Sequence, residues 1–119
     1  VKQFTFTIGS DASWDNETIP LWQAPKDNTI TIVQLDATTI GTSNPTLTFC
    51  IEERAFGSLA SSGVGIMAYQ TATSSGITVT SFTNANIAKR AHLTFVTGDA
   101  VESGTVEFIT GPVYYTIDE

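Results

Sequence analysis

Apolar and polar residues alternate with a period of two along most of the chain, and this pattern predicts β-strands. Near the start, Phe4, Phe6 and Ile8 share one face and threonines occupy the other, as in a half-buried strand. No segment keeps a helical period over about ten residues. Turn residues separate strands roughly every 8–12 positions, and the predicted strands are 2–8, 17–24, 29–40, 46–53, 66–71, 77–82, 91–97, 105–110 and 113–117.

The longest alternating stretch is predicted to form a hairpin around which the rest of the chain is built. Two runs, 29–40 and 46–53, are joined by the turn-forming residues 41–45, which is typical of antiparallel pairing. Between Ile32 and Val33 the apolar positions change parity. This change predicts a β-bulge, or a strand that buries first one face and then the other.

The segments around this hairpin carry weaker signals. Pro20 lies within 17–24 and makes that segment an edge strand or an irregular crossover, because proline cannot donate to a ladder. Residues 54–65 predict a long loop, and long loops in compact domains are often functional or mobile. Residues 74–76 are expected to form a hairpin turn and 84–89 one helical turn, with an acidic turn at 98–104.

Together these segments predict a single domain spanning residues 1–119. The expected fold class is all-β, a two-sheet antiparallel β-sandwich that is jelly-roll-like and has about eight strands. A closed β-barrel is the alternative.

Charge narrows the classes of partner. The chain has 5 Lys and Arg against 12 Asp and Glu, a net charge of −7, and only 14% of its residues are charged. Nucleic acid and anionic membranes are both disfavoured, because each is bound through clustered positive charge. Serine and threonine replace much of the usual charged surface, and threonine suits strands.

No reactive constellation stands out, so the sequence predicts no enzyme, no cofactor and no metal site. Cys50 lies within a strand pattern, where a packed thiol is expected rather than a nucleophile. His92 has no nucleophile motif around it, which favours a surface or interface histidine. Glu52 and Glu53 are adjacent and therefore point to opposite faces of a strand, so they do not form a catalytic pair.

Two patterns suggest ligands, each with a simpler alternative. Asp11, Ser13 and Asp15 have the spacing that opens a calcium loop, but Asn16 stands where a glycine is needed, which favours a solvated acidic loop. The aromatic residues suit either a sugar-stacking platform or core packing, and they are Trp14, Trp22, Tyr69, Tyr114 and Tyr115. Tyr114 and Tyr115 are expected to face opposite sides of one strand.

The run Ile-Pro-Leu-Trp-Gln-Ala-Pro at 19–25, followed by the alternating residues 29–37, resembles small all-β virion proteins of tailed bacteriophages. The segments 47–55 and 111–116 add to the resemblance. It implies a virion structural protein, a head decoration (cement) protein or a tail- or fibre-associated component. A protein of this kind assembles in the host cytoplasm and is located in the virion.

The resemblance also implies partners: the major capsid protein or a tail protein of the same virion, and further copies of the chain, with a homotrimer expected. The contact surface is predicted on the irregular stretch at Phe56, Leu59, Val64, Ile66 and Met67, and on the first strand, since exposed sheet edges accept strands from a partner. The alternative function is a glycan-binding β-sandwich module.

Overall fold

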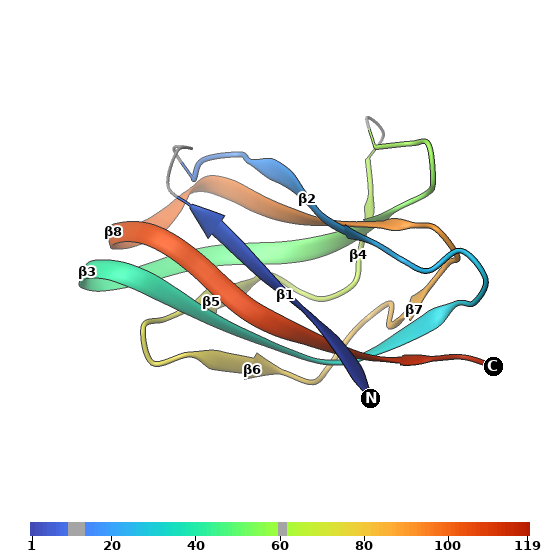
Figure 1. Ribbon diagram of the computed structural model, residues 1–119. Coiled ribbons are helices and arrows are strands. Elements are labelled where there is room, and N and C mark those ends of the chain that lie inside the picture. Colours follow the sequence, from blue (N-terminus) through green and yellow to red (C-terminus); the bar gives the residue numbers. More distant parts are fainter. Residues whose placement is uncertain (10–13, 60–61) are drawn as a thin grey trace.

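The computed structural model describes residues 1–9, 14–59 and 62–119, apart from the side chains of 99–101, and within them it contains strands and no helix. The predicted all-β class is therefore confirmed (Figure 1). The helical turn expected at 84–89 is wrong, because a short strand lies there. The strands are β1 (Lys2–Gly9), β2 (Thr18–Gln23), β3 (Ile30–Arg54), β4 (Val64–Gly65), β5 (Gln70–Ala72), β6 (Ile77–Val79), β7 (Asn86–Ile87) and β8 (His92–Ile117).

The two long strands, β3 and β8, organise the fold. They pair antiparallel from Ile30 opposite Ile117 to Arg54 opposite His92. Midway both strands bend, where the pairing shifts register between Thr42 and Thr46. In Figure 1, β3 and β8 run side by side to the left-hand end of the molecule, where both turn back, so that their two halves lie in different layers. They therefore form one long ribbon that is folded in half.

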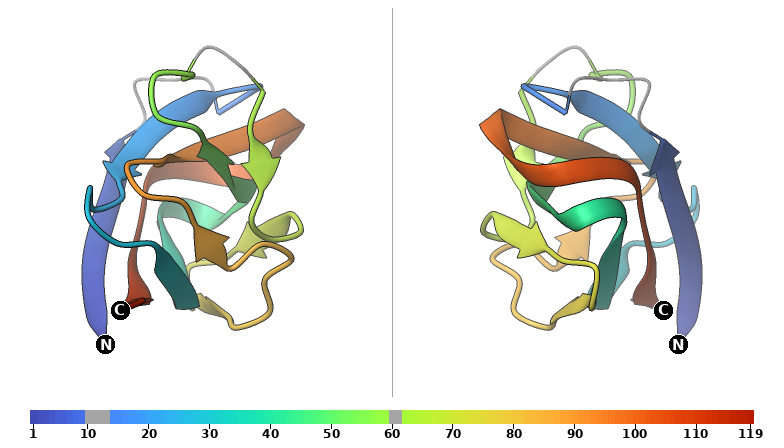
Figure 2. Two further views of the ribbon diagram at one scale, coloured as in Figure 1. Left: turned by 90° about the vertical axis from the view of Figure 1, so that its right-hand side faces the viewer. Right: turned by 90° about the vertical axis from the view of Figure 1, so that its left-hand side faces the viewer.

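The folded ribbon supplies the central strands of two layers. One layer contains β1, residues 105–117 of β8 and residues 30–42 of β3, with β6 and β7 beyond. The other contains β2, residues 92–103 of β8 and residues 46–54 of β3, with β4 and β5 beyond. This is the strand order of a jelly roll, as predicted. Because the ribbon bends without a break, all eight strands stay in one nearly barrel-shaped sheet (Figure 2).

The hairpin predicted for residues 29–53 is wrong, because the two halves of β3 pair with β8 in different layers. Residues 41–45 are instead the corner of the ribbon. Ser43 and Asn44 have φ values of 61° and 55°, and across from them Gly104 has a φ of 65° and packs so closely that a Cβ would lie 2.4 Å from the Ser43 carbonyl oxygen. A hairpin turn and a corner need the same residues with positive φ, so the local sequence does not separate them.

The hairpin turn expected at 74–76 and the acidic turn expected at 98–104 are also wrong. The short strands β5 and β6 flank residues 74–76 but pair with different halves of β3, so this turn also crosses between layers. Residues 98–104 lie within β8, opposite the corner of β3.

Other local predictions are confirmed. Val33 is the extra residue of a β-bulge, since Ile32 pairs with Tyr115 and Gln34 with Tyr114. The segment containing Pro20 forms the edge strand β2, which pairs with β8.

The core fills the space between the two layers. Phe49 and Phe95, neighbours in one layer, stack with ring centroids 5.2 Å apart. Phe6 reaches Phe95 from the opposite layer at 6.2 Å. Each fully buried aliphatic or aromatic side chain contributes about 1.5–3 kcal/mol, and these side chains include Ile30, Ile32, Leu35, Leu47, Ile51, Ile66, Ile87, Leu93, Ile109 and Val113.

Trp14 closes one end of this core, although its sequence context indicates a polar loop. Its side chain is 3% exposed, its indole N–H donates a hydrogen bond of 3.0 Å to the Val106 carbonyl oxygen, and its ring meets Phe95 edge-on at 6.5 Å. Its backbone adopts a left-handed conformation, with a φ of 63°. The indole therefore adds apolar area and also satisfies a buried carbonyl.

Candidate interaction surface

The structure divides the five predicted interface residues into two groups. Ile66 and Met67 are 0% and 4% exposed, so their placement on a contact surface is wrong for this conformation. These two neighbours lie in a bend between β4 and β5 and pack beside the end of β3, where the Ile66 N–H donates to the Ile51 carbonyl oxygen. Phe56 and Leu59, in the loop after β3, and Val64, at the start of β4, are 52%, 39% and 61% exposed.

Phe56 is held in a defined environment. The guanidinium carbon of Arg90 lies 3.7 Å from the centroid of the Phe56 ring, a cation–π contact. The His92 ring lies nearly parallel to the Phe56 ring, with centroids 6.3 Å apart. Arg90 is fixed in turn, because its backbone N–H donates to the Pro25 carbonyl oxygen and its own carbonyl accepts from the Gln23 amide.

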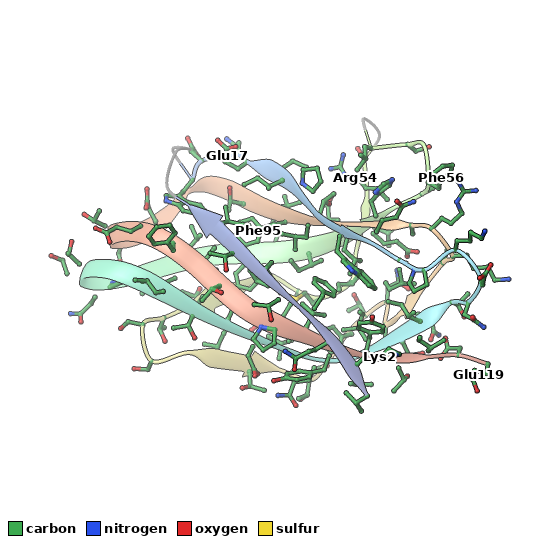
Figure 3. All side chains as sticks on the ribbon, viewed as in Figure 1. Lys2, Glu17, Arg54, Phe56, Phe95 and Glu119 are labelled. Atoms are coloured by element: carbon green, nitrogen blue, oxygen red, sulfur yellow. The ribbon has the colours of Figure 1, made fainter. Side chains whose placement is uncertain are left out.

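Arg54 ties down the loop that carries Phe56 and Leu59. One guanidinium nitrogen donates to the Leu59 carbonyl oxygen at 2.6 Å, and another bridges to the Glu52 carboxylate at 3.1 Å. Gly63 passes over this ion pair so closely that a Cβ would lie 2.8 Å from a Glu52 carboxylate oxygen. Figure 3 shows Arg54 and Phe56 at the same end of the molecule. The exposed side chains therefore project from an anchored loop.

We call Phe56, Leu59, Val64, Arg90 and His92 the Phe56 surface. Charges of both signs lie around it: Arg90 contacts the Phe56 ring, whereas Glu52 pairs with Arg54 and the Glu53 carboxylate accepts from the Ala88 amide, next to Lys89. Two backbone hydrogen bonds join the turn before β8 to the turn after β2. The Ala24 N–H donates to the Ala91 carbonyl oxygen, and the Arg90 N–H donates to the Pro25 carbonyl oxygen.

The candidate catalytic residues are not brought together. Glu52 pairs with Arg54, whereas the Glu53 carboxylate accepts hydrogen bonds from the Asn84 side chain and the Ala88 amide. These different partners fit the prediction that the two carboxylates point to opposite faces. His92 faces Phe56.

Cys50 is packed as predicted. It is 4% exposed, and burial raises the pKa of its thiol; the Tyr69 hydroxyl lowers this pKa and the Glu52 charge raises it. The thiolate, which is the nucleophilic form, is therefore disfavoured.

The five aromatic residues do not form one platform. Trp14 is buried, and Trp22 stacks on Phe4 with centroids 4.4 Å apart. Tyr115 is 8% exposed and Tyr114 lies on the opposite face of β8, as predicted. Core and edge packing accounts for most of these rings.

Asp11 and Ser13, the first two residues of the calcium pattern, lie outside the described residues. Across 1–9, 14–59 and 62–119 no three His, Cys, Asp or Glu side chains gather as metal ligands. In the same ranges no helix has the length and apolarity to cross a bilayer.

Sequence reasoning did not foresee the contacts of Arg90 and His92 with Phe56. Phe56 is separated from both by more than thirty positions in the chain, and only the pairing of Arg54 with His92 at the ends of β3 and β8 brings them together. The adjacent cations Lys89 and Arg90 were the one available signal.

Comparisons with known proteins give no relative: no family model, no curated protein and no solved structure matches this chain.

Proposed function

We propose that the chain is a non-enzymatic virion structural protein of a tailed bacteriophage, a head decoration or cement protein that attaches through the Phe56 surface. The sequence resemblance supplies the class, and jelly rolls are common among viral capsid proteins. Fold alone does not define function. The observation that carries the proposal is the anchored, half-exposed Phe56 under Arg90.

The composition of this surface suits binding. Aromatic and arginine side chains dominate the energetics of protein interfaces when they are held in place before binding. Arg54 and the Pro25 carbonyl hold the two elements that carry Phe56 and Arg90. On a capsid lattice many copies of a modest contact act together, so each copy needs only a small contact such as Phe56 with Arg90.

The charge around Phe56 indicates the chemistry of the partner. Arg90, which lies over the Phe56 ring, and its chain neighbour Lys89 fit an apolar depression rimmed by carboxylates on the major capsid protein or on a tail protein of the same virion. Attachment is expected to weaken as salt screens these charges.

The test uses phage particles prepared without the protein, to which purified protein is added and measured by co-sedimentation. The matched variants are Phe56→Ala and Phe108→Ala, because Phe108 is also a half-exposed phenylalanine, 43% exposed, on β8. We expect Phe56→Ala to weaken attachment at least about tenfold, the effect of a hot-spot side chain, and Phe108→Ala to stay within about twofold.

Equal loss in both variants, or no attachment of the unmodified protein, would contradict the proposal. So would a gene that lies away from any capsid, portal or tail gene.

A further inference from the structure

We propose that β1 is a self-association edge, at which two copies of the chain pair antiparallel and extend one layer of the sandwich across a two-fold axis. This inference does not depend on the virion role. It rests on a difference between β1 and every other edge strand of the described residues.

The other edges carry features that oppose strand addition. Strand β2 contains Pro20 and a register shift between Pro20 and Trp22, and prolines and bulges both protect edges. Strands β4, β5, β6 and β7 are two or three residues long, too short to serve as a template. Strand β1 has eight residues, no proline and an unbroken register from Lys2 opposite Tyr115 to Gly9 opposite Phe108.

The alternation of backbone hydrogen bonds identifies the residues on the open side of β1. On β3 the Ile32 and Thr39 amides donate away from β8, to Ala85 and Thr73. Opposite them, Tyr115 and Ile109 of β8 must therefore direct their N–H and C=O groups toward β1. Tyr115 and Ile109 pair with Lys2 and Ile8, so the even residues of β1 bond to β8.

The odd residues, Gln3, Thr5 and Thr7, consequently direct their backbone groups outward. Figure 2 places β1 at the outer margin of the molecule in both views. Their side chains are exposed and uncharged, so no like charges meet in a pair of copies despite the net charge of −7. An open row of donors and acceptors on a regular strand is the template for β-sheet extension.

A second copy fits this edge better than an unrelated strand, because an antiparallel strand is complementary to itself. The register that uses all three outward residues places Thr5 opposite Thr5 of the second copy and Gln3 opposite Thr7. It forms roughly six backbone hydrogen bonds. Threonine pairs across strands already occur within the chain, at Thr7 with Thr110 and at Thr48 with Thr71.

Partly buried aromatic rings lie beside the same edge. Phe4 of β1 stacks on Trp22 of β2, and both side chains keep part of their surface in solvent. Sheet extension would cover apolar area here in addition to pairing the backbone, which is the combination that makes strand addition stable.

The test is a charge-swap pair at the two-fold axis, Thr5→Lys and Thr5→Glu, measured by analytical ultracentrifugation over a dilution series. The unmodified protein should sediment as a dimer of twice the 12.7 kDa chain mass. Each variant alone places like charges opposite each other and should dissociate at least about tenfold more readily. An equimolar mixture should restore the dimer, because Lys then meets Glu.

Thr18→Lys on the protected strand β2 is the matched control, since Thr18 is also exposed, and it should leave the dimer unchanged. Circular dichroism establishes that each variant is folded. Added salt should tighten the dimer, because each copy carries −7 and screening reduces their repulsion.

Three results would overturn the β1 proposal: a monomer up to about 1 mM, the weak limit of specific association; a trimer, which a two-fold edge cannot form; or charge-swap variants that do not restore each other. None of these results bears on attachment through Phe56, so the two proposals fail separately.

Discussion

Phe95 and Phe56 are the same residue type in two different environments. Phe95 is fully buried and is surrounded by Phe6, Trp14 and Phe49. Phe56 is 52% exposed and contacts Arg90 and His92. The first ring stabilises the two layers against each other, whereas the second ring keeps about half of its surface in solvent and is the one through which we propose that the protein attaches.

The largest expected effect is at the buried ring. Phe95→Ala should lower the free energy of unfolding by about 3–5 kcal/mol, because it removes apolar contacts to both layers and leaves a cavity. Urea unfolding followed by tryptophan fluorescence measures this change. A loss below about 1 kcal/mol would show that Phe95 does not hold the layers together.

Trp14→Phe is expected to have an intermediate effect. The variant keeps an aromatic ring at the end of the core but removes the N–H that donates to the Val106 carbonyl oxygen. A buried acceptor without its partner costs about 1–3 kcal/mol. The midpoint of thermal unfolding of Trp14→Phe should lie between those of Phe95→Ala and Phe56→Ala. A midpoint equal to that of the unmodified protein would contradict the role of the hydrogen bond.

The same contrast between buried and exposed groups recurs at Cys50 and Tyr69. Burial raises the pKa of the Cys50 thiol above 9.0, and burial together with the Cys50 charge raises the pKa of Tyr69 above 10.0. Because both groups lose a proton on ionising, the unfolded chain ionises first. Their contribution to stability is therefore complete below about pH 9 and is lost as the pH rises through the raised values.

Alkaline denaturation of the unmodified protein and of Cys50→Ala tests this linkage. The stability of Cys50→Ala should fall less steeply between about pH 9 and 11. In the folded protein Cys50 should also react with iodoacetamide more slowly than in the urea-unfolded chain at the same pH. Equal rates would show that the thiol is not held in its neutral form by the fold.

The smallest effect on stability is expected at the exposed ring. Phe56→Ala should lower the free energy of unfolding by about 0.5–1 kcal/mol, the value of an exposed cation–π contact, although it is the variant expected to lose attachment. Its unfolding curve should lie close to that of Phe108→Ala and far from that of Phe95→Ala. A loss comparable to that of Phe95→Ala would remove the distinction between the two rings.

The sequence predicted the parts of this fold that depend on local periodicity. The first strand, the edge strand with Pro20 and the bulge at Val33 follow from alternation and from proline chemistry. The corner at Ser43 and Asn44 did not, because its residues are also those of a hairpin turn. A turn can join two strands that pair with each other, or it can cross between the layers. Which of the two occurs depends on the strand that pairs with β3, and this strand, β8, lies more than fifty residues away in the sequence.

Which residues of the candidate surface are exposed also depends on distant parts of the chain. In the irregular stretch after Arg54, Phe56 and Leu59 are exposed, but Ile66 and its neighbour Met67 are both buried. Trp14 was assigned to a polar loop because its neighbours are polar. In both cases the packing partner comes from a distant strand, so composition around the residue is a poor guide to its burial.

The most direct test of the folded ribbon uses the single native thiol. In the structure Cys50 lies opposite Val96 of β8, whereas a hairpin turning at residues 41–45 would place it opposite Asp36. We therefore expect Val96→Cys, refolded in an oxidising buffer, to form an intramolecular disulfide with Cys50, since cross-strand partners lie within disulfide reach. Asp36→Cys should retain two free thiols by mass spectrometry after alkylation; a disulfide in Asp36→Cys and none in Val96→Cys would contradict the ribbon.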